Sequence, residues 1–208
     1  MYFSDIKYKE NIYLYAGDCI NNISQYPFIG LSLQCNNNTN IQHNILNKMD
    51  LYDNSVDIYQ SEDVFEHIEY NELYNVINEI YRVLKPGGLF RFSMPDYRCN
   101  ILYNRSIKTE NNEIIFDPNG GGGYDYKNSK VINGGHVWFP KYESVKSLLD
   151  KTNFEKKNIN FLHYYDENNN PVTKIIDYSK GYIHRTPDFD NRVNNPYRPM
   201  SIIVDCYK

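Results

Sequence analysis

The sequence is poor in alanine, which occurs once, at Ala16, whereas asparagine occurs 29 times and tyrosine 21 times in 208 residues. Alanine is the best helix former and asparagine one of the poorer ones, so helix propensity does not explain this usage. Asparagine, tyrosine, isoleucine and lysine have A/T-rich codons, and the bias is typical of an A+T-rich genome. We therefore interpret the asparagine runs as loops, not as an aggregation-prone segment.

Paired cysteines and long apolar runs are also missing. The four cysteines form no C-x-x-C pair and have no histidine at zinc-ligand spacing, so no metal site is predicted and the thiols are expected to stay reduced. The N-terminal residues include no apolar stretch typical of a signal peptide. No run approaches the ~18 apolar residues of a membrane span. These absences predict a protein of the cytoplasm (of the host, if the source is viral) with no membrane partner.

Excess positive charge is absent as well. The chain has 22 basic and 26 acidic residues and a net charge of −4. This balance counts against a protein that coats nucleic acid or an anionic membrane. Hydrophobic residues make up 41% of the chain, which is enough for a core, and charged residues 23%, which excludes a disordered tail.

The first hundred residues alternate short apolar runs with helical patterns, which is typical of parallel α/β architecture. Strands are predicted at residues 12–16, 28–33, 56–60 and 88–94, and residues 41–45 fit either a short strand or an extended connection. A helix is predicted at 71–84, because its apolar residues recur at positions i, i+3, i+4 and i+7. The Lys85-Pro86-Gly87 sequence that follows is a helix stop.

The second half of the chain is predicted to complete the same domain. Residues 98–135 are polar and glycine-rich, and we interpret them as a long insertion beside the site. A helix at 141–151 and strands at 157–165 and 200–207 follow, with a polar connection over residues 166–199. No internal repeat is present, so residues 1–208 are expected to form one domain.

Several segments resemble class I S-adenosylmethionine (SAM)-dependent methyltransferases. They are the Phe65-Glu66-His67-Ile68 segment after the third strand, the R-V-L-K-P-G-G segment at residues 82–88, Met94-Pro95-Asp96, and the closing strand. The resemblance covers nearly the whole chain. These segments are similar in particular to a bacterial-type subgroup that is found among sugar and surface-polysaccharide genes. It implies a Rossmann-like α/β fold with a mostly parallel sheet, helices on both faces and an antiparallel last strand.

The resemblance also implies a SAM site, although its usual motif is altered. The first strand of the family ends in L-x-x-G-x-G, whereas this chain keeps only Gly17, followed by Asp18 and Cys19. Ser32 stands where an acid usually binds the ribose, and Asn44 where an acid often faces the adenine. The complete set of cofactor residues that the resemblance predicts is Gly17, Asp18, Ser32, Asn44, Ile45, Ser61 and Glu62.

Methyl transfer to oxygen needs a base for the acceptor proton, and three residues are candidates. His136 follows the glycine-rich stretch, Asp96 ends a strand at the edge where α/β sheets bind ligands, and His67 belongs to the family-like Glu66-His67 pair. Ser61 and Glu62 can equally cap a helix start. Trp138 can stack on a ligand or pack in the core.

Two functions remain open from the sequence. The first is SAM-dependent methyl transfer, at oxygen, to a small molecule or a glycan or nucleotide-sugar precursor. The alternative is a degenerate methyltransferase fold that serves as a binding or partner subunit, which the residues at Cys19, Ser32 and Asn44 favour. A nucleic-acid substrate is disfavoured because the chain has no basic stripe. Nothing in the sequence indicates an oligomeric state.

Overall fold

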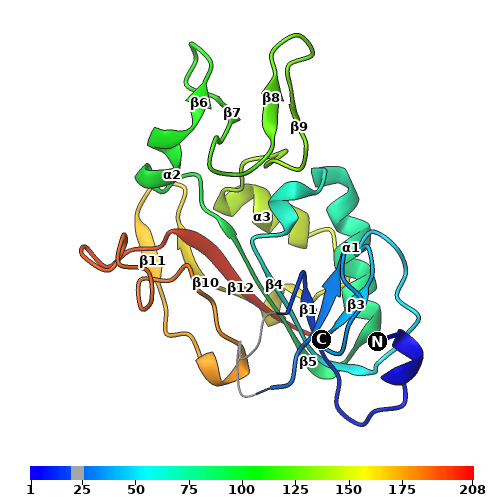
Figure 1. The fold of residues 1–208 in the computed structure, drawn as a ribbon. Coiled ribbons are helices and arrows are strands. Elements are labelled where there is room, and N and C mark those ends of the chain that lie inside the picture. The colour runs from blue at the N-terminus through cyan, green and yellow to red at the C-terminus, as the bar shows by residue number, and fades with distance from the viewer. Residues whose placement is uncertain (20–25) are drawn as a thin grey trace.

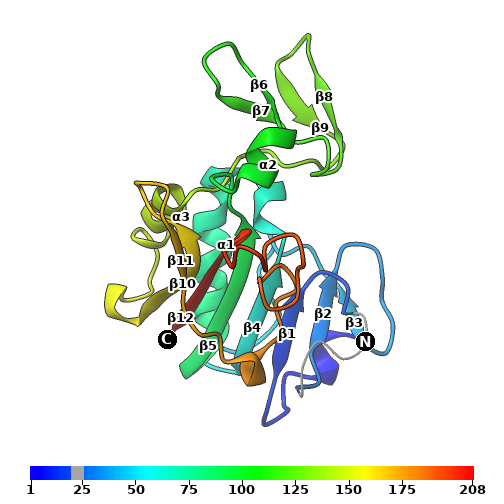
Figure 2. The same cartoon turned by 90° about the vertical axis from the view of Figure 1, so that its left-hand side faces the viewer.

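An eight-stranded sheet organises the computed structural model, which describes residues 1–19 and 26–208 (Figures 1 and 2). The strand order is β11-β10-β12-β5-β4-β1-β2-β3. The strands of this sheet are β1 (Tyr13–Ala16), β2 (Ile29–Ser32), β3 (Asn40–Gln42), β4 (Val56–Glu62), β5 (Leu84–Pro95), β10 (Ile159–Tyr165), β11 (Pro171–Thr173) and β12 (Ser201–Tyr207).

One part of the sheet is parallel and the other antiparallel. Strands β3, β2, β1, β4 and β5 pair in parallel, whereas β12 runs antiparallel to both β5 and β10. The predicted antiparallel last strand is confirmed. After β3 the chain crosses back to the other side of β1 to form β4. Open α/β sheets bind ligands beyond the carboxyl ends of the strands at such a reversal, so this edge is where a site is expected.

The two longest helices, α1 (Tyr70–Val83) and α3 (Tyr142–Leu149), pack on the same face of the sheet. The periodic apolar residues of α1, which include Leu73, Ile77 and Ile80, are buried as predicted. The helix ends one residue earlier than expected because the chain turns at Leu84 directly into β5. The Lys85-Pro86-Gly87-Gly88 stretch therefore lies within the strand and not in a separate turn.

The opposite face of the sheet differs from the expectation of helices on both faces. Residues 174–199 cover part of it, and their regular structure is the one-turn 3-10 helix η4 (Tyr178–Lys180) (Figure 2). This polar, proline-containing segment supplies Ile176 and Ile183, which pack on Ile203 of β12. Apolar side chains spaced along an irregular segment are sufficient to exclude water there, so no helix is needed.

A buried ion pair anchors the covering segment to the sheet. Arg91 of β5 donates to both carboxylate oxygens of Asp205 on β12, at 2.7 Å each. Its remaining terminal nitrogen, Nη1, donates to the backbone carbonyls of Asp177 and Gly181, both at 2.8 Å. Gln60 of β4 adds a bond to the carbonyl of Tyr182. The guanidinium thus joins β5 to β12 within the sheet and also joins the sheet to the segment above it.

Residues 98–135 contain more regular structure than a long loop. They form α2 (Asn100–Arg105) and two small hairpins that stand away from the sheet (Figure 1). The hairpins are β6 (Ile107–Lys108) with β7 (Ile114–Phe116), and β8 (Gly123–Asp125) with β9 (Lys130–Ile132). Strands of two or three residues are too short to show an alternating pattern, which is why the sequence did not predict them.

None of the helices in the described part of the chain is long and apolar enough to cross a lipid bilayer.

Candidate functional site

A cavity of about 560 Å³ opens at the carboxyl ends of the parallel strands. Its walls come from the loops after β1, β2 and β3, the segment after β4, and one residue that follows β9. The lining residues are Gly17, Asp18, Leu31, Ser32, Leu33, Gln34, His43, Asn44, Ile45, Leu46, Asp63, Val64, His67, Ile68 and Gly134. The cavity therefore lies at the reversal of strand order, where the topology places a ligand site.

The loop after β1 is fixed against the neighbouring strands. Gly17 has a φ of +106°, a conformation that side chains rarely adopt, and its N–H donates to the carbonyl of Leu31 at 3.0 Å. The N–H of Cys19 donates to Oδ1 of Asn40 at 2.8 Å. Gly30 makes this approach possible, because a Cβ there would lie 2.6 Å from backbone atoms of both Gly17 and Cys19.

Ser32 and Asn44 shape the two loops that form the opposite wall. The Ser32 side chain is 1% exposed, and its Oγ accepts from the N–H groups of Gln34 and Cys35 at 3.1 and 2.8 Å. Oδ1 of Asn44 accepts from the N–H of Leu46 at 3.0 Å. The hydroxyl proton of Ser32 and the amide group of Asn44 remain able to donate hydrogen bonds.

Two of the predicted cofactor residues, Ser61 and Glu62, do not line the cavity. Ser61 is fully buried within β4. Glu62 instead accepts from the backbone N–H of His184 and contacts Nδ1 of the same residue, both at 2.8 Å, on the face covered by residues 174–199. Burial raises the pKa of the Glu62 carboxyl. The other five, Gly17, Asp18, Ser32, Asn44 and Ile45, lie together in its walls.

His67 is the one catalytic candidate that lines the cavity. It belongs to the one-turn 3-10 helix η2 (Phe65–His67), and its ring is exposed. Its Nδ1 lies 2.9 Å from the carbonyl oxygen of Gly134, which only accepts, so Nδ1 carries the proton. Nε2 therefore has a free lone pair.

His136 is buried behind His67 and does not line the cavity. It is 4% exposed, and its ring meets that of His67 edge-on at 4.6 Å. Burial lowers the pKa of His136 to about 4, which makes it a weak base. Gly120 provides the space for this ring, because a Cβ there would lie 2.7 Å from it. The glycine-rich stretch thus packs on a histidine.

Comparisons with known proteins agree with this architecture. A family model described as a methyltransferase domain matches residues 24–92, which span β2 to most of β5 and leave out the loop at Gly17. Three similar solved structures are SAM-dependent methyltransferases. That from Archaeoglobus fulgidus is 12% identical with a TM-score of 0.50, and 97% of this chain covers 87% of it. That from Mesorhizobium loti is 12% identical with a TM-score of 0.52, and the match covers 95% of this chain and 90% of that one.

The third, from Clostridium acetobutylicum, is 13% identical with a TM-score of 0.51, and the match covers 96% of this chain and 85% of that one. No match is found among curated proteins. The fold is that of class I SAM-dependent methyltransferases. The family-model match and the fold are both those of methyltransferases.

Within the methyltransferase fold, Asp96 has a structural environment. It lies at the carboxyl end of β5, is fully buried, and does not line the cavity. Its Oδ2 accepts from the N–H of Tyr165 at 2.7 Å and its Oδ1 from the N–H of Arg98 at 3.0 Å. Burial raises the pKa of Asp96 to about 6 in spite of these bonds. The carboxylate joins the end of β5 to the end of β10.

We expect Asp96→Asn to lower the free energy of unfolding by about 1–3 kcal/mol near pH 8, because its NH₂ group would face a backbone N–H. The native pKa of about 6 exceeds the ordinary 3.8, so the native wild type binds an extra proton between these values. Wild-type stability from this group therefore falls as the pH rises from 4 to 6. Urea denaturation should show a deficit about 2 kcal/mol larger near pH 4.5 than near pH 8. Equal deficits would contradict the raised pKa.

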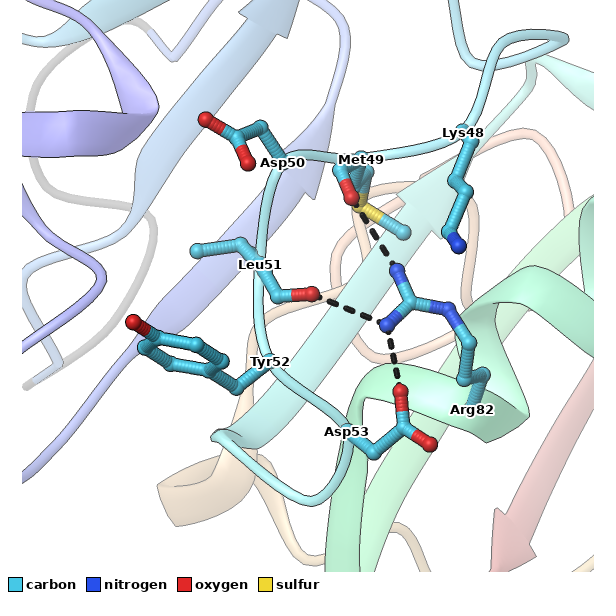
Figure 3. A pocket seen from close by; sticks show the side chains of 7 residues that line it. All are labelled: Lys48, Met49, Asp50, Leu51, Tyr52, Asp53 and Arg82. Atoms are coloured by element: carbon cyan, nitrogen blue, oxygen red, sulfur yellow. Dashed lines mark hydrogen bonds and ion pairs between the residues drawn. The ribbon is translucent and has the colours of Figure 1, made fainter.

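A second, open hollow lies around Arg82 at the end of α1 (Figure 3). Residues 48–53 curve around its guanidinium, which donates to the carbonyls of Met49 and Leu51 and to the carboxylates of Asp53 and Glu79. Each guanidinium nitrogen already has a protein acceptor. We conclude that Arg82 has a structural role here, because its bonds hold the loop before β4 in place.

Sequence reasoning missed several residues of the cavity. Gln34, His43 and Asp63 line it, although none was a candidate. Each lies within two positions of a predicted residue, so extending each prediction along its loop would have found them. Asp63 is paired with Arg185 at 3.1 Å, and burial raises the pKa of its carboxyl. Trp138 packs on Tyr70 at the helical face of the sheet, which favours packing in the core over stacking on a ligand.

Proposed function

We propose that this protein transfers the methyl group of SAM to a hydroxyl group of a small molecule, a glycan precursor or a nucleotide-sugar, in the cytoplasm. The observation that carries the proposal is the cavity at the strand-order reversal, because five predicted cofactor residues from three separate loops meet in its walls. The four cysteines are all unpaired, as reducing conditions would keep them.

The cavity fits the proposed cofactor in size and in lining. Small-molecule sites range from about 300 to 1,000 Å³, and are apolar with a few polar groups that fix orientation. Leu31, Ile45 and Ile68 supply apolar surface suited to an adenine ring. Ser32 and Asn44 would donate hydrogen bonds toward the ribose and the base, and the Gly17–Asp18 loop would accommodate the amino-acid part. When bound, SAM supplies a methyl group on a positively charged sulfur.

The residues of the chain would position the acceptor and accept its proton. In methyl transfer, orientation of the two reactants contributes much of the rate acceleration. His67 borders the cavity with a free Nε2, which can take the proton of an acceptor hydroxyl as it reacts. This geometry favours His67 over His136 and Asp96, because both of these are buried outside the cavity.

The alternative is a degenerate scaffold without catalysis, and one observation favours it. Both accepting lone pairs of the Ser32 hydroxyl are used by the N–H groups of Gln34 and Cys35. The end of β2 therefore offers ribose a donor but no acceptor charge. Binding of SAM with a neutral contact at this position is expected to be weak.

Restoring the charge tests the two functions. Aspartate in Ser32→Asp can accept the same two N–H groups with one oxygen and offer its second oxygen to the ribose hydroxyls. We expect S-adenosylhomocysteine to bind Ser32→Asp about five- to a hundredfold more tightly than wild type in titration calorimetry, since a hydrogen bond to a charged group contributes about 1–3 kcal/mol.

The matched control is Ser32→Asn, which has the same shape without the charge and should show no such gain. If neither wild type nor Ser32→Asp binds SAM or S-adenosylhomocysteine at millimolar concentrations, the proposed methyl transfer is wrong. The degenerate scaffold would then be the better account.

A further inference from the structure

Three side chains from distant parts of the sequence meet at the inner border of the cavity. Glu66 and His67 belong to η2, and His136 follows β9. Their potential ligand atoms all lie within 4.8 Å of one another. Nε2 of His136 is 3.6 Å from Oε1 of Glu66. We call these three residues the Glu-His-His cluster.

Three hydrogen bonds hold the cluster together. The N–H of Val137 donates to the carbonyl of Glu66 at 2.9 Å, and Nε1 of Trp138 donates to the carbonyl of Phe65 at 2.9 Å. The third is the bond from Nδ1 of His67 to Gly134. Residues 134–138 are thus attached to η2 along its length, so the cluster is part of the rigid framework.

The hydrogen bonds of the two histidines define their tautomers. The hydroxyl of Tyr97 donates its single proton to Asp117 at 2.7 Å, and the carboxylate of Asp117 is also paired with Arg105 at 2.6 Å. The Tyr97 oxygen must therefore accept from Nδ1 of His136, at 2.5 Å. Nδ1 of His67 also carries its proton, as shown above. Both histidines accordingly keep a lone pair on Nε2.

The carboxyl group of Glu66 has no hydrogen-bond partner among the described residues. Its side chain is 0% exposed, and both carboxylate oxygens are buried. The nearest group of the cluster, Nε2 of His136, presents a lone pair and not a proton. A buried carboxylate is ordinarily paired, hydrogen-bonded or bound to a metal. The centre of the cluster therefore lacks the partner that a buried carboxylate ordinarily has.

We propose that Glu66, His67 and His136 bind a divalent transition-metal ion such as Zn²⁺ through one carboxylate oxygen and the two Nε2 atoms. One carboxylate and two imidazoles form a common metal-binding set that leaves positions open for exogenous ligands. In metal sites, ligating histidines donate their other N–H to a carbonyl or another polar group, as both do here.

The present spacing is close to that of a bound site. Bonds of about 2.0–2.2 Å at tetrahedral angles place ligand atoms about 3.3 Å apart. The pair formed by Glu66 and His136 is near this separation, whereas the exposed ring of His67 would have to turn toward the ion to reach it. The sequence did not predict the site because the two histidines come together only in the folded chain.

An ion here would change how the acceptor is activated. Because His67 lines the cavity, the ion would lie at its border, with an open position for water or an acceptor hydroxyl. A bound metal lowers the pKa of such a group. As a ligand, Nε2 of His67 would no longer take the proton of the acceptor hydroxyl, which would pass to solvent water at the border of the cavity instead. Metal binding itself does not depend on SAM, so the two proposals can fail separately.

The test is metal titration of the full chain after treatment with a chelator. We expect one Zn²⁺ or Co²⁺ ion per chain by calorimetry, and a Co²⁺ absorption spectrum without the intense band of a cysteine ligand. Glu66→Gln and His67→Ala should each weaken metal binding at least tenfold. Even removal of a group that only hydrogen-bonds to a metal ligand typically lowers metal affinity ten- to a hundredfold. His67 is exposed, so its variant should fold normally, which circular dichroism verifies.

His184→Ala is the matched control, because His184 is an exposed histidine bonded to Glu62 outside the cluster. Its affinity for Co²⁺ should equal that of wild type. Absence of binding, a cysteine-ligand band, or equal affinities in Glu66→Gln, His67→Ala and wild type would overturn the proposal. Absence of binding would leave a proton, not a metal, as the partner of Glu66.

Discussion

Arg91→Met is expected to lower the free energy of unfolding by about 3–5 kcal/mol, the usual effect of removing one partner of a buried ion pair. The variant would leave the buried carboxylate of Asp205 without its two bonds, and the carbonyls of Asp177 and Gly181 without a donor. Urea denaturation monitored by tyrosine or tryptophan fluorescence measures the loss. A loss below about 1 kcal/mol would mean that the guanidinium does not hold residues 174–199 to the sheet.

The double variant Arg91→Met/Asp205→Leu separates the two parts of this effect. It removes the stranded carboxylate, so it should be more stable than Arg91→Met alone, since buried pairs can often be replaced by apolar residues at little cost. The carbonyls of Asp177 and Gly181 stay unpaired in both variants. Any remaining deficit of the double variant therefore measures the attachment of the covering segment, apart from the charge.

Gly30→Ala is expected to weaken binding of S-adenosylhomocysteine at least tenfold, which corresponds to about 1.4 kcal/mol. The new methyl group would lie 2.6 Å from the N of Cys19 and 2.6 Å from the O of Gly17, and backbone atoms can escape only if the loop moves. It would also meet Oδ1 of Asn40, the acceptor of the Cys19 N–H. The loop that forms one wall of the cavity must shift as a result.

The control for this substitution is Gly123→Ala at the start of β8, where a Cβ would lie at an ordinary 3.7 Å from Ile132. Its binding affinity should equal that of wild type. Gly30→Ala should also lose about 1–3 kcal/mol of stability, as overpacked positions do. Unchanged affinity in Gly30→Ala, measured by calorimetry under conditions where the variant is folded, would mean that the loop after β1 takes no part in cofactor binding.

The parts of the fold that could be predicted are those with a sustained apolar pattern. The stripe from Leu73 to Ile80 identified α1 to within one residue, because a helix face repeats over several turns. The strands β1, β2, β4 and β12 were found from short apolar runs. The strand β5 begins earlier than expected, because Pro86 and Gly87 resemble a turn in sequence although they are part of the strand.

The parts that could not be predicted depend on contacts between distant residues. The small hairpins of the insertion have no period, and the cover of residues 174–199 depends on Arg91, whose role is visible only once Asp205 lies beside it. The cavity was predictable in place, since parallel strands end at one edge. The Glu-His-His cluster was not, because no local spacing joins His67 to His136.

A crystal structure of the protein with S-adenosylhomocysteine tests the central claim most directly, namely that the cavity at the carboxyl ends of β1, β2 and β3 is the cofactor site. We predict the adenosine part between Ser32 and Asn44, and the amino-acid part at the Gly17–Asp18 loop. Ligand density elsewhere on the molecule, or an empty cavity in crystals grown at millimolar S-adenosylhomocysteine, would contradict it.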